Sequence, residues 1–243
     1  MNRLEVTWDV HGHTMWDAWK NKESYDLVER DDGFIDYIPG SSYLANFEDW
    51  PQIERRAMGL ARGRVIDLGC GAGRVSLHLQ HMGYDVLGFD VSTLALKVCR
   101  ERGLRKTRRG SIHDLEFPRN SFDTAIMFGN NFSLLGTPTR GMRILKRMHQ
   151  ILSEGGLILA ETLDPYDTVE QAHLAYHRMN RKKGRLPGQV RMRVRYRQYA
   201  TPWFYWLLLS RNEMGELARR AGFEVAEFID PSGPRYIGVL RKT

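Results

Sequence analysis

The chain has 243 residues, of which 42% are hydrophobic and 11% aromatic. This length and composition suit one sizeable packed domain with an appended segment, and they exclude a disordered chain or two large domains. Lys and Arg number 36 against 29 Asp and Glu, and the formal net charge of +7 fits a basic surface and leaves nucleic acid open as a partner.

Residues 1–9 are polar and acidic, unlike the apolar core of a secretory signal. The longest apolar run, residues 203–209, is too short to cross a bilayer, so no membrane partner is expected. Cys70 and Cys99 form neither a disulfide framework nor a metal-ligand spacing. We therefore expect a reduced, cytoplasmic protein without a bound metal.

The pattern of the chain divides it into three parts. Residues 1–60 mix aromatic side chains with charges, Gly and Pro, and we expect short helices and loops that form an N-terminal cap segment. Residues 61–163 and 211–243 alternate apolar runs of strand length with helical repeats and are expected to form one α/β core. Residues 164–210 interrupt the alternation, which predicts an inserted strand and cap region.

The alternation in the core predicts a doubly wound, mostly parallel seven-stranded sheet with an antiparallel last strand. Strands are expected at 64–68, 85–89, near 106–112, 124–128, 157–161, 223–229 and 236–240. Helices are expected at 74–82, 93–102, 140–152 and 211–221. Gly155-Gly156 should close the third helix, and residues 231–234 should form the turn of a C-terminal hairpin.

A glycine-rich segment, Asp67-Leu68-Gly69-Cys70-Gly71-Ala72-Gly73, follows the first core strand and opens a helix. Glycine lets a backbone approach a ligand and permits positive φ in a tight turn. The alternate spacing differs from the dinucleotide fingerprint, whose third Gly stands three residues after the second. A carboxylate at Asp67 also disfavours a pyrophosphate. The loop thus predicts a cationic or amino-bearing ligand, and a dehydrogenase is the least favoured enzyme.

Asp90 ends the second core strand, about 20 residues after the loop, where an acid in this architecture accepts hydrogen bonds from ribose. Its alternative role is an N-cap for the helix that begins near Ser92. The presence of the loop favours the ligand role.

On these features, residues 64–161 resemble the class I (Rossmann-like) S-adenosylmethionine-dependent methyltransferases of small-molecule type. In that family the loop at 67–73 wraps the methionine part of the cofactor, and the acid at Asp90 holds the ribose. Residues 110–123 resemble the stretch that lines the adenine, although Ser111 stands where an acid is usual and Glu116 replaces a proline. The resemblance implies S-adenosylmethionine as cofactor, with S-adenosylhomocysteine as product, held by Asp67, Gly69, Cys70, Gly71, Gly73, Asp90, Val91, Ser111, Ile112 and Phe128.

The end of the fourth strand, Gly129-Asn130-Asn131-Phe132, is similar to the Gly-Asn-Ser-Phe stretch of glycine N-methyltransferases, in which the asparagine contacts the substrate carboxylate. It lacks the Asn/Asp-Pro-Pro-aromatic sequence of adenine or glutamine-amide methylation and the Pro-Cys pair of cytosine-C5 methylation. Asn130 and Asn131 are therefore expected either to contact the substrate or to cap the following loop.

Alternation in residues 190–197 places Arg191, Arg193, Arg195 and Arg197 on one face of a strand. This face is either solvated or, through Arg193 and Arg195, a clamp for a substrate carboxylate or phosphate. The aromatic run at 203–206 is expected to pack in the core, in a second strand of a hairpin.

Methyl transfer from a sulfonium requires alignment of the nucleophile, and a base where that nucleophile is protonated. The candidates for a catalytic role are His113, Asn130, Asn131 and Tyr25. We expect transfer to a nitrogen or oxygen atom of a small molecule, carboxylate-bearing acceptors included. The alternatives are an RNA methyltransferase and a cofactor-binding module without catalysis, and the oligomeric state is left open, a homodimer included.

Overall fold

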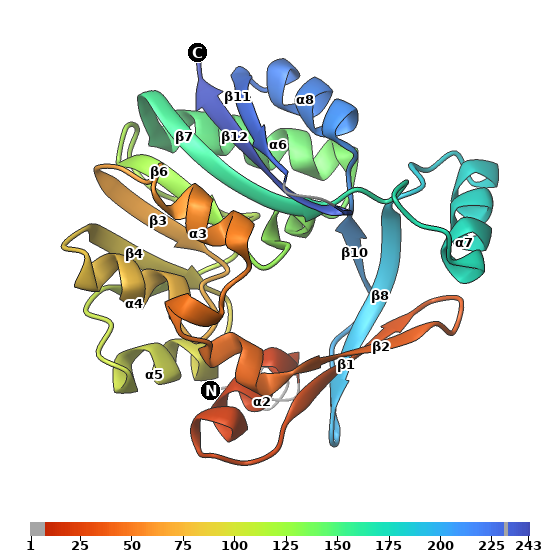
Figure 1. Cartoon of the computed structure of the whole chain (residues 1–243), viewed down its shortest axis with the longest axis horizontal. Helices are drawn as coiled ribbons and strands as arrows, with labels where there is room; N and C mark the ends of the chain where they lie inside the picture. The colour runs from red at the N-terminus through yellow and green to blue at the C-terminus, as the bar shows by residue number, and fades with distance from the viewer. Residues whose placement is uncertain (1–7, 231–232) are drawn as a thin grey trace. The chain divides into compact units, whose positions relative to one another are not determined.

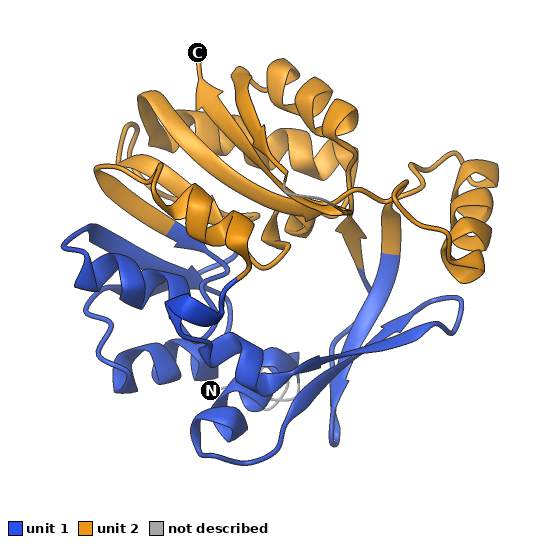
Figure 2. Ribbon diagram, viewed as in Figure 1, with its two compact units in different colours: residues 1–50, 67–111, 191–204 blue, residues 51–66, 112–190, 205–243 orange. Residues whose placement is uncertain are grey.

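The structure is a computed structural model of the whole chain, and it describes residues 8–230 and 233–243. The chain divides into two compact units (Figure 2). Unit 1 comprises residues 1–50, 67–111 and 191–204, and unit 2 comprises residues 51–66, 112–190 and 205–243. These bounds differ from those of the three predicted parts, which were 1–60, 61–163 with 211–243, and 164–210.

The larger sheet has seven strands, in the order β11-β12-β7-β6-β3-β4-β5 (Figure 1). In that order their bounds are Phe223–Ile229, Arg235–Lys242, Leu152–Leu163, Phe122–Met127, Arg64–Leu68, Asp85–Asp90 and Thr107–Arg109. The pairs β4–β5 and β6–β7 are parallel, whereas β12 runs antiparallel to both β7 and β11. The predicted fold class, a mostly parallel sheet with an antiparallel last strand, is therefore confirmed.

In unit 1, α4 (Arg74–His81) and α5 (Thr93–Glu101) pack against β4. Each helix buries one apolar face: Val75, Leu77 and Leu79 from α4, and Ala95, Leu96, Val98 and Cys99 from α5. Both helices follow the predicted periodicity because buried side chains recur every three or four residues.

In unit 2, α6 (Pro138–Ile151) packs beside α8 (Arg211–Arg220) and against β7, and α3 (Gln52–Met58) packs against β11 and β12. Figure 1 shows α6 and α8 next to these strands. Because α6 ends at Ile151 and β7 begins at the next residue, Gly155-Gly156 lie inside the strand. The prediction that these glycines close the helix was wrong. Gly155 adopts a φ of 67° within the strand instead.

The N-terminal segment contains α2 (Val10–Trp19), β1 (Tyr25–Arg30), β2 (Ile35–Pro39), η1 (Gly40–Leu44) and η2 (Phe47–Asp49). The expectation of helices and loops alone was wrong for residues 25–39, since β1 and β2 form an antiparallel hairpin. Gly33, with a φ of 91°, lies in its turn. The charged residues of β1 concealed the strand pattern.

A second sheet has the order β10-β8-β1-β2, with β9 paired to β8. Its remaining strands are β8 (Gln189–Tyr196), β9 (Tyr199–Ala200) and β10 (Phe204–Leu207), which confirms a strand in the insertion and a strand in the aromatic run. The insertion also contains α7 (Gln171–Lys182), which the sequence analysis did not predict.

The predicted turn at 231–234 lies partly outside the described residues, which omit 231 and 232. The two strands that it joins pair antiparallel, so the C-terminal hairpin is confirmed. Within the described part of the chain, no helix combines the length and the apolarity needed to cross a membrane.

Candidate active site

The glycine-rich loop leaves β3 and turns sharply into α4. Gly69, Gly71 and Gly73 have φ of 75°, 54° and 80°, in the left-handed region that favours glycine. The Gly69 amide donates to the Phe89 carbonyl at 2.8 Å, which ties the loop to β4. A Cβ on Gly71 would lie 3.0 Å from Met15 Cε. The alternate glycines are therefore needed by the backbone of this turn.

Asp67 lies at the end of β3 with only 3% of its surface exposed. Its Oδ2 accepts a hydrogen bond from Ser76 Oγ at 2.7 Å. Burial raises the pKa of the Asp67 carboxyl to about 6, in spite of the opposing effect of this hydrogen bond. A ligand with a positive charge beside Asp67 would stabilise its ionised form.

Asp90 joins the loop to the turn between β4 and α5. Its Oδ2 accepts from the Gly71 amide at 2.9 Å, and its Oδ1 accepts from the Ser92 amide at 2.8 Å. The N-cap of α5 is Ser92, whose Oγ accepts from the Ala95 amide at 2.9 Å. The alternative prediction that Asp90 caps this helix is therefore wrong. Each carboxylate oxygen of Asp90 has two lone pairs, so a hydroxyl of a ligand could donate to either one.

The remaining predicted cofactor contacts differ in exposure. Val91 is 59% exposed, Ser111 and Ile112 are partly buried, and Cys70 and Phe128 are buried. The neighbouring Cys99 thiol, together with burial, raises the pKa of the Cys70 thiol well above its usual range. Contact of these side chains with a cofactor stays a prediction.

Asn130 and Asn131 follow β6, at the start of η3 (Asn131–Leu135). Asn130 adopts a φ of 66°, and its Oδ1 accepts from Ser133 Oγ at 2.8 Å. Ser133 Oγ also lies 2.9 Å from Thr162 Oγ1 on β7. The Asn130 side chain thus makes a polar contact within the loop, but it does not cap the backbone of η3. Contact of either asparagine with a substrate stays a prediction.

The arginines of β8 and the adjoining Arg197 form ion pairs with acids on β1, directly after β1 and on α2. Arg193 Nε and Nη2 donate to the two oxygens of Glu29 at 2.8 and 2.9 Å, and Arg195 Nη1 lies 3.6 Å from the same carboxylate. Arg191 Nη1 lies 4.0 Å from Asp31 Oδ2. Arg197 follows the end of β8 at Tyr196 and has a φ of 51°, so the prediction that it shares the strand face of the other three arginines was wrong; its Nη2 lies 3.1 Å from Asp17 Oδ2 on α2. These carboxylates offset the repulsion between the guanidinium groups. A substrate clamp by Arg193 or Arg195 stays a prediction, and such a substrate would compete with Glu29.

Two other catalytic candidates lie in different units. Tyr25, in unit 1, is 47% exposed and packs edge-on against Tyr196, with 6.3 Å between ring centroids. His113, in unit 2, is exposed, and partial burial of its ring together with the Arg140 charge lowers its pKa. A catalytic role of either residue stays a prediction.

The sequence analysis missed an aspartate–histidine pair in unit 1. His11 Nδ1, on α2, lies 2.6 Å from Asp26 Oδ2, on β1. Tyr43 Oη donates to the same oxygen at 2.6 Å, and Thr14 Oγ1 donates to Oδ1 at 2.6 Å. Asp26 is completely buried. His11 and Thr14 are one helical turn apart, but no local pattern places them beside a residue on a strand.

A buried pair of acids was also missed, in unit 2. Glu161 on β7 is completely buried; its Oε2 accepts from the Gly129 amide at 2.7 Å and its Oε1 from Arg235 Nη1 at 2.8 Å. Glu54 on α3 is 1% exposed and shares a hydrogen bond with the Glu161 carboxyl. Burial and the charge of Glu54 raise the pKa of Glu161 to about 8, so this pair of acids retains a proton at neutral pH. Glu161 is the only charged residue in the apolar run 157–163, a signal that could have identified it.

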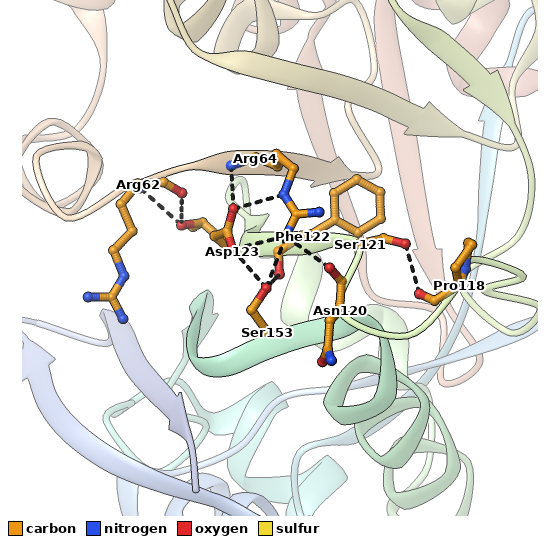
Figure 3. A network of polar contacts seen from close by, with 9 residues as sticks. Arg62, Arg64, Pro118, Asn120, Ser121, Phe122, Asp123 and Ser153 are labelled. Carbon is orange, nitrogen blue, oxygen red and sulfur yellow. Dashed lines mark hydrogen bonds and ion pairs between the residues drawn. The ribbon is translucent and has the colours of Figure 1, made fainter.

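A recess of about 340 Å³ lies at the amino ends of β3, β6 and β7, lined by Arg62, Gly63, Asp123, Ser153, Glu154 and Gly156. Figure 3 shows the network beside it, in which Asp123 accepts from Arg64 Nε and Ser153 Oγ at 3.1 and 2.7 Å. The Arg64 guanidinium holds the pKa of Asp123 well below its usual range. Ligands of parallel α/β sheets bind outside the carboxyl ends of the strands, so this network is structural.

No group of three or more His, Cys, Asp or Glu side chains that could hold a metal ion occurs among residues 8–230 and 233–243.

Comparison with known proteins agrees with this geometry. Residues 65–156 match the family model described as a methyltransferase domain. The chain is 29% identical over 146 residues to a cypemycin N-terminal methyltransferase from a Streptomyces species, which covers 59% of this chain and 54% of that protein. It is 28% identical over 112 residues to a ubiquinone biosynthesis O-methyltransferase from Xanthomonas oryzae, which covers 44% and 46%. The chain thus spans about half the length of the curated relatives that it matches.

A solved structure matches almost the whole chain. It is a SAM-dependent methyltransferase from Bacteroides fragilis, in complex with S-adenosyl-L-homocysteine. The match has a TM-score of 0.82 and 25% sequence identity, and it covers 96% of this chain and 94% of the other.

Proposed function

Because the chain is a class I S-adenosylmethionine-dependent methyltransferase by its matched domain and its fold, we propose that it methylates a nitrogen or oxygen atom of a small-molecule acceptor by in-line displacement. Acceptors that bear a carboxylate are included. The main support for this proposal is the contact between the glycine-rich loop and Asp90, in which the Gly71 amide donates a hydrogen bond to Asp90 Oδ2 at 2.9 Å.

The residues of unit 1 fit this cofactor. The loop turns at three glycines with positive φ, so no Cβ projects where a ligand would lie against its backbone. S-adenosylmethionine supplies a methyl group on a positively charged sulfur and also carries an ammonium group. The buried Asp67 and the partly buried Asp90 suit that charge, and Asp90 would accept hydrogen bonds from the ribose hydroxyls.

The acceptor class is supported by the relatives and by the sequence after β6. One relative is named an N-terminal methyltransferase and another an O-methyltransferase, so nitrogen and oxygen are both reasonable acceptor atoms. Gly129-Asn130-Asn131 lacks the prolines typical of methylation on nucleic-acid bases. An RNA substrate is less favoured, because Arg193 and Arg195 are engaged by Glu29 and offer less charge to phosphates.

Turnover of S-adenosylmethionine against a panel of amines, phenols and carboxylates tests the proposal. We expect release of S-adenosylhomocysteine with at least one small acceptor and little dependence of binding on salt. Asp90→Ala should weaken S-adenosylhomocysteine binding roughly 10- to 100-fold, because a charged hydrogen-bond acceptor is lost. Asp85→Ala, at the exposed opposite end of β4, is the matched control and should bind normally. Methylation of RNA with no small acceptor would contradict the proposed substrate class.

A further inference from the structure

Within unit 1, helix α2 lies against the glycine-rich loop that follows β3. Asp9, its N-cap, accepts from the Leu94 amide at 3.2 Å, and this contact joins the start of α2 to the start of α5. Met15 is the side chain that a Cβ on Gly71 would meet, at 3.0 Å. His11 stands one helical turn before Met15, and residues four apart lie on the same face of a helix. The face of α2 that carries His11 therefore adjoins the loop.

Asp26 fixes the orientation of the His11 ring. The carboxylate is completely buried and accepts three hydrogen bonds of 2.6 Å, from His11, Thr14 and Tyr43. An acceptor-only carboxylate requires that Nδ1 of the ring carry the proton, so Nε2 of the neutral imidazole is the basic nitrogen. Within residues 8–230 and 233–243, Nε2 has no hydrogen-bond partner, and the His11 side chain is 42% exposed.

The charged and titratable groups that face His11 come from three elements and from the N-cap of α2. They are Asp26 on β1, Asp90 on β4, Asp9 ahead of α2, and Tyr43 on η1. Partial burial of the ring lowers its pKa, but the Asp26 carboxylate and the two other acids outweigh burial, and the pKa of His11 is raised. A base whose pKa lies near the working pH is the most effective one in general base catalysis.

We propose that His11, oriented by Asp26, is the proton acceptor of the methyl-transfer reaction. This inference rests on the proposed function and restricts the acceptor to one whose nucleophilic oxygen or nitrogen still carries a proton to be lost. His11 Nε2 takes the proton of the acceptor O–H or N–H while the lone pair of that atom forms the new bond to the methyl carbon. S-adenosylmethionine, when bound, would supply the methyl group from a positively charged sulfur that keeps the electron pair of the broken bond, and the His11 imidazolium would then release its proton to water. A buried carboxylate, a ring with a fixed tautomer and an open second nitrogen are the parts of known acid–base catalysts.

The competing interpretation is that the pair only fastens α2 to β1. His11→Asn distinguishes this structural role from the proposed role as a base. The Asn amide can replace Nδ1–H as a donor to Asp26, whereas the basic nitrogen Nε2 is removed. His81→Asn, on an exposed position of α4, is the matched control. If His11 is the base, His11→Asn should bind S-adenosylhomocysteine within about threefold of wild type by calorimetry, and its turnover should fall roughly 10²- to 10⁴-fold.

The acceptor probes are 4-hydroxybenzoate, catechol, glycine and benzylamine. With any probe that is methylated, we expect the methylation rate of the wild type to decrease as the pH is lowered. In His11→Asn this decrease of the rate at low pH should be absent. Imidazole in solution should restore part of the activity of His11→Ala. A normal pH profile in His11→Asn, or loss of S-adenosylhomocysteine binding in step with turnover, would overturn the proposal and leave a structural or cofactor-binding role.

Diethylpyrocarbonate, which modifies neutral imidazole nitrogens, tests the site without an acceptor. Peptide mapping should show His11 modified with a pH midpoint above 6.5, and Asp26→Asn should lower that midpoint. Failure to modify His11 in the folded protein would overturn the proposal even if none of the four probes is methylated. Failure to bind S-adenosylhomocysteine would instead contradict the proposed function, so the two failures are distinguishable.

Discussion

Replacement of Glu161 by Gln should remove a large part of the pH dependence of folding stability. Burial and Glu54 raise the pKa of Glu161 from 4.5 to about 8. At 1.36 kcal/mol for each unit of pKa, a shift of about 3.5 units corresponds to roughly 5 kcal/mol between the protonated and ionised forms. Because Glu54 shares the hydrogen bond, this free energy belongs to the pair of acids and not to Glu161 alone.

Because the pKa of Glu161 is raised in the folded protein, folding stability should decrease as the pH rises. The native state holds the Glu161 proton more tightly than the unfolded chain between about pH 4.5 and 8. Raising the pH through this window therefore lowers stability, and the contribution of this proton is complete below pH 4.5. Gln stays neutral, and its amide can donate to Glu54 as the protonated carboxyl does, so Glu161→Gln should lose much less stability over the same window.

Urea unfolding at pH 5, 6, 7 and 8 measures the effect. We expect the free energy of unfolding of wild type relative to Glu161→Gln to fall by a few kcal/mol from pH 5 to 8. Glu224→Gln, with a half-exposed side chain on β11, is the control and should run parallel to wild type. Curves of wild type and Glu161→Gln that remain parallel within about 0.5 kcal/mol would refute a protonated Glu161, because surface substitutions reach that size.

Three further predictions follow from single contacts. Gly71→Ala should weaken S-adenosylhomocysteine binding at least about tenfold in calorimetry, since its φ of 54° is strained for Ala and the new Cβ would crowd Met15; an unchanged Kd would count against the strained loop. Arg193→Ala should lower the free energy of urea unfolding by about 1 kcal/mol or less, because its pair with Glu29 is partly exposed, whereas a loss above about 3 kcal/mol would show a larger role. The lowered pKa of Asp123 contributes stability above its unfolded pKa that is lost as the pH falls through its folded pKa; acid unfolding of Asp123→Asn should therefore be less steep than that of wild type, and equal slopes would contradict this.

The core could be predicted because its signals are local. Apolar residues at helical spacing predicted α4, α5 and α6, and the alternate glycines Gly69, Gly71 and Gly73 predicted the loop after β3, where each has a positive φ. The hairpin of β1 and β2 escaped prediction because the buried residues of β1, Asp26 and Arg30, are charged and every residue of β2 is exposed, so neither strand has the buried apolar face that a sequence pattern reveals. Gly155 and Gly156 resembled a helix end, but the chain continues as an extended strand from Leu152.

In the candidate site, too, residues that follow a local sequence pattern could be predicted, and residues brought together by the fold could not. Asp67 and Asp90 were identified because Asp67 stands one residue before the end of β3 and Asp90 is the last residue of β4, and both strands have a recognisable pattern. His11 and Asp26 come together from a helix and a strand 15 residues apart, a contact that no spacing rule encodes. The arginines of β8 could be placed on one face from alternation, but the identity of their partners depended on the pairing of β8 with β1, opposite Glu29.

We propose that the loop after β3 and Asp90 form a site for S-adenosylmethionine. Isothermal titration of the full chain with S-adenosylhomocysteine, and in parallel with NAD, tests it most directly. We predict binding of one S-adenosylhomocysteine per chain, weakened roughly 10- to 100-fold in Asp90→Ala, and no binding of NAD. Binding of NAD without binding of S-adenosylhomocysteine would contradict the account.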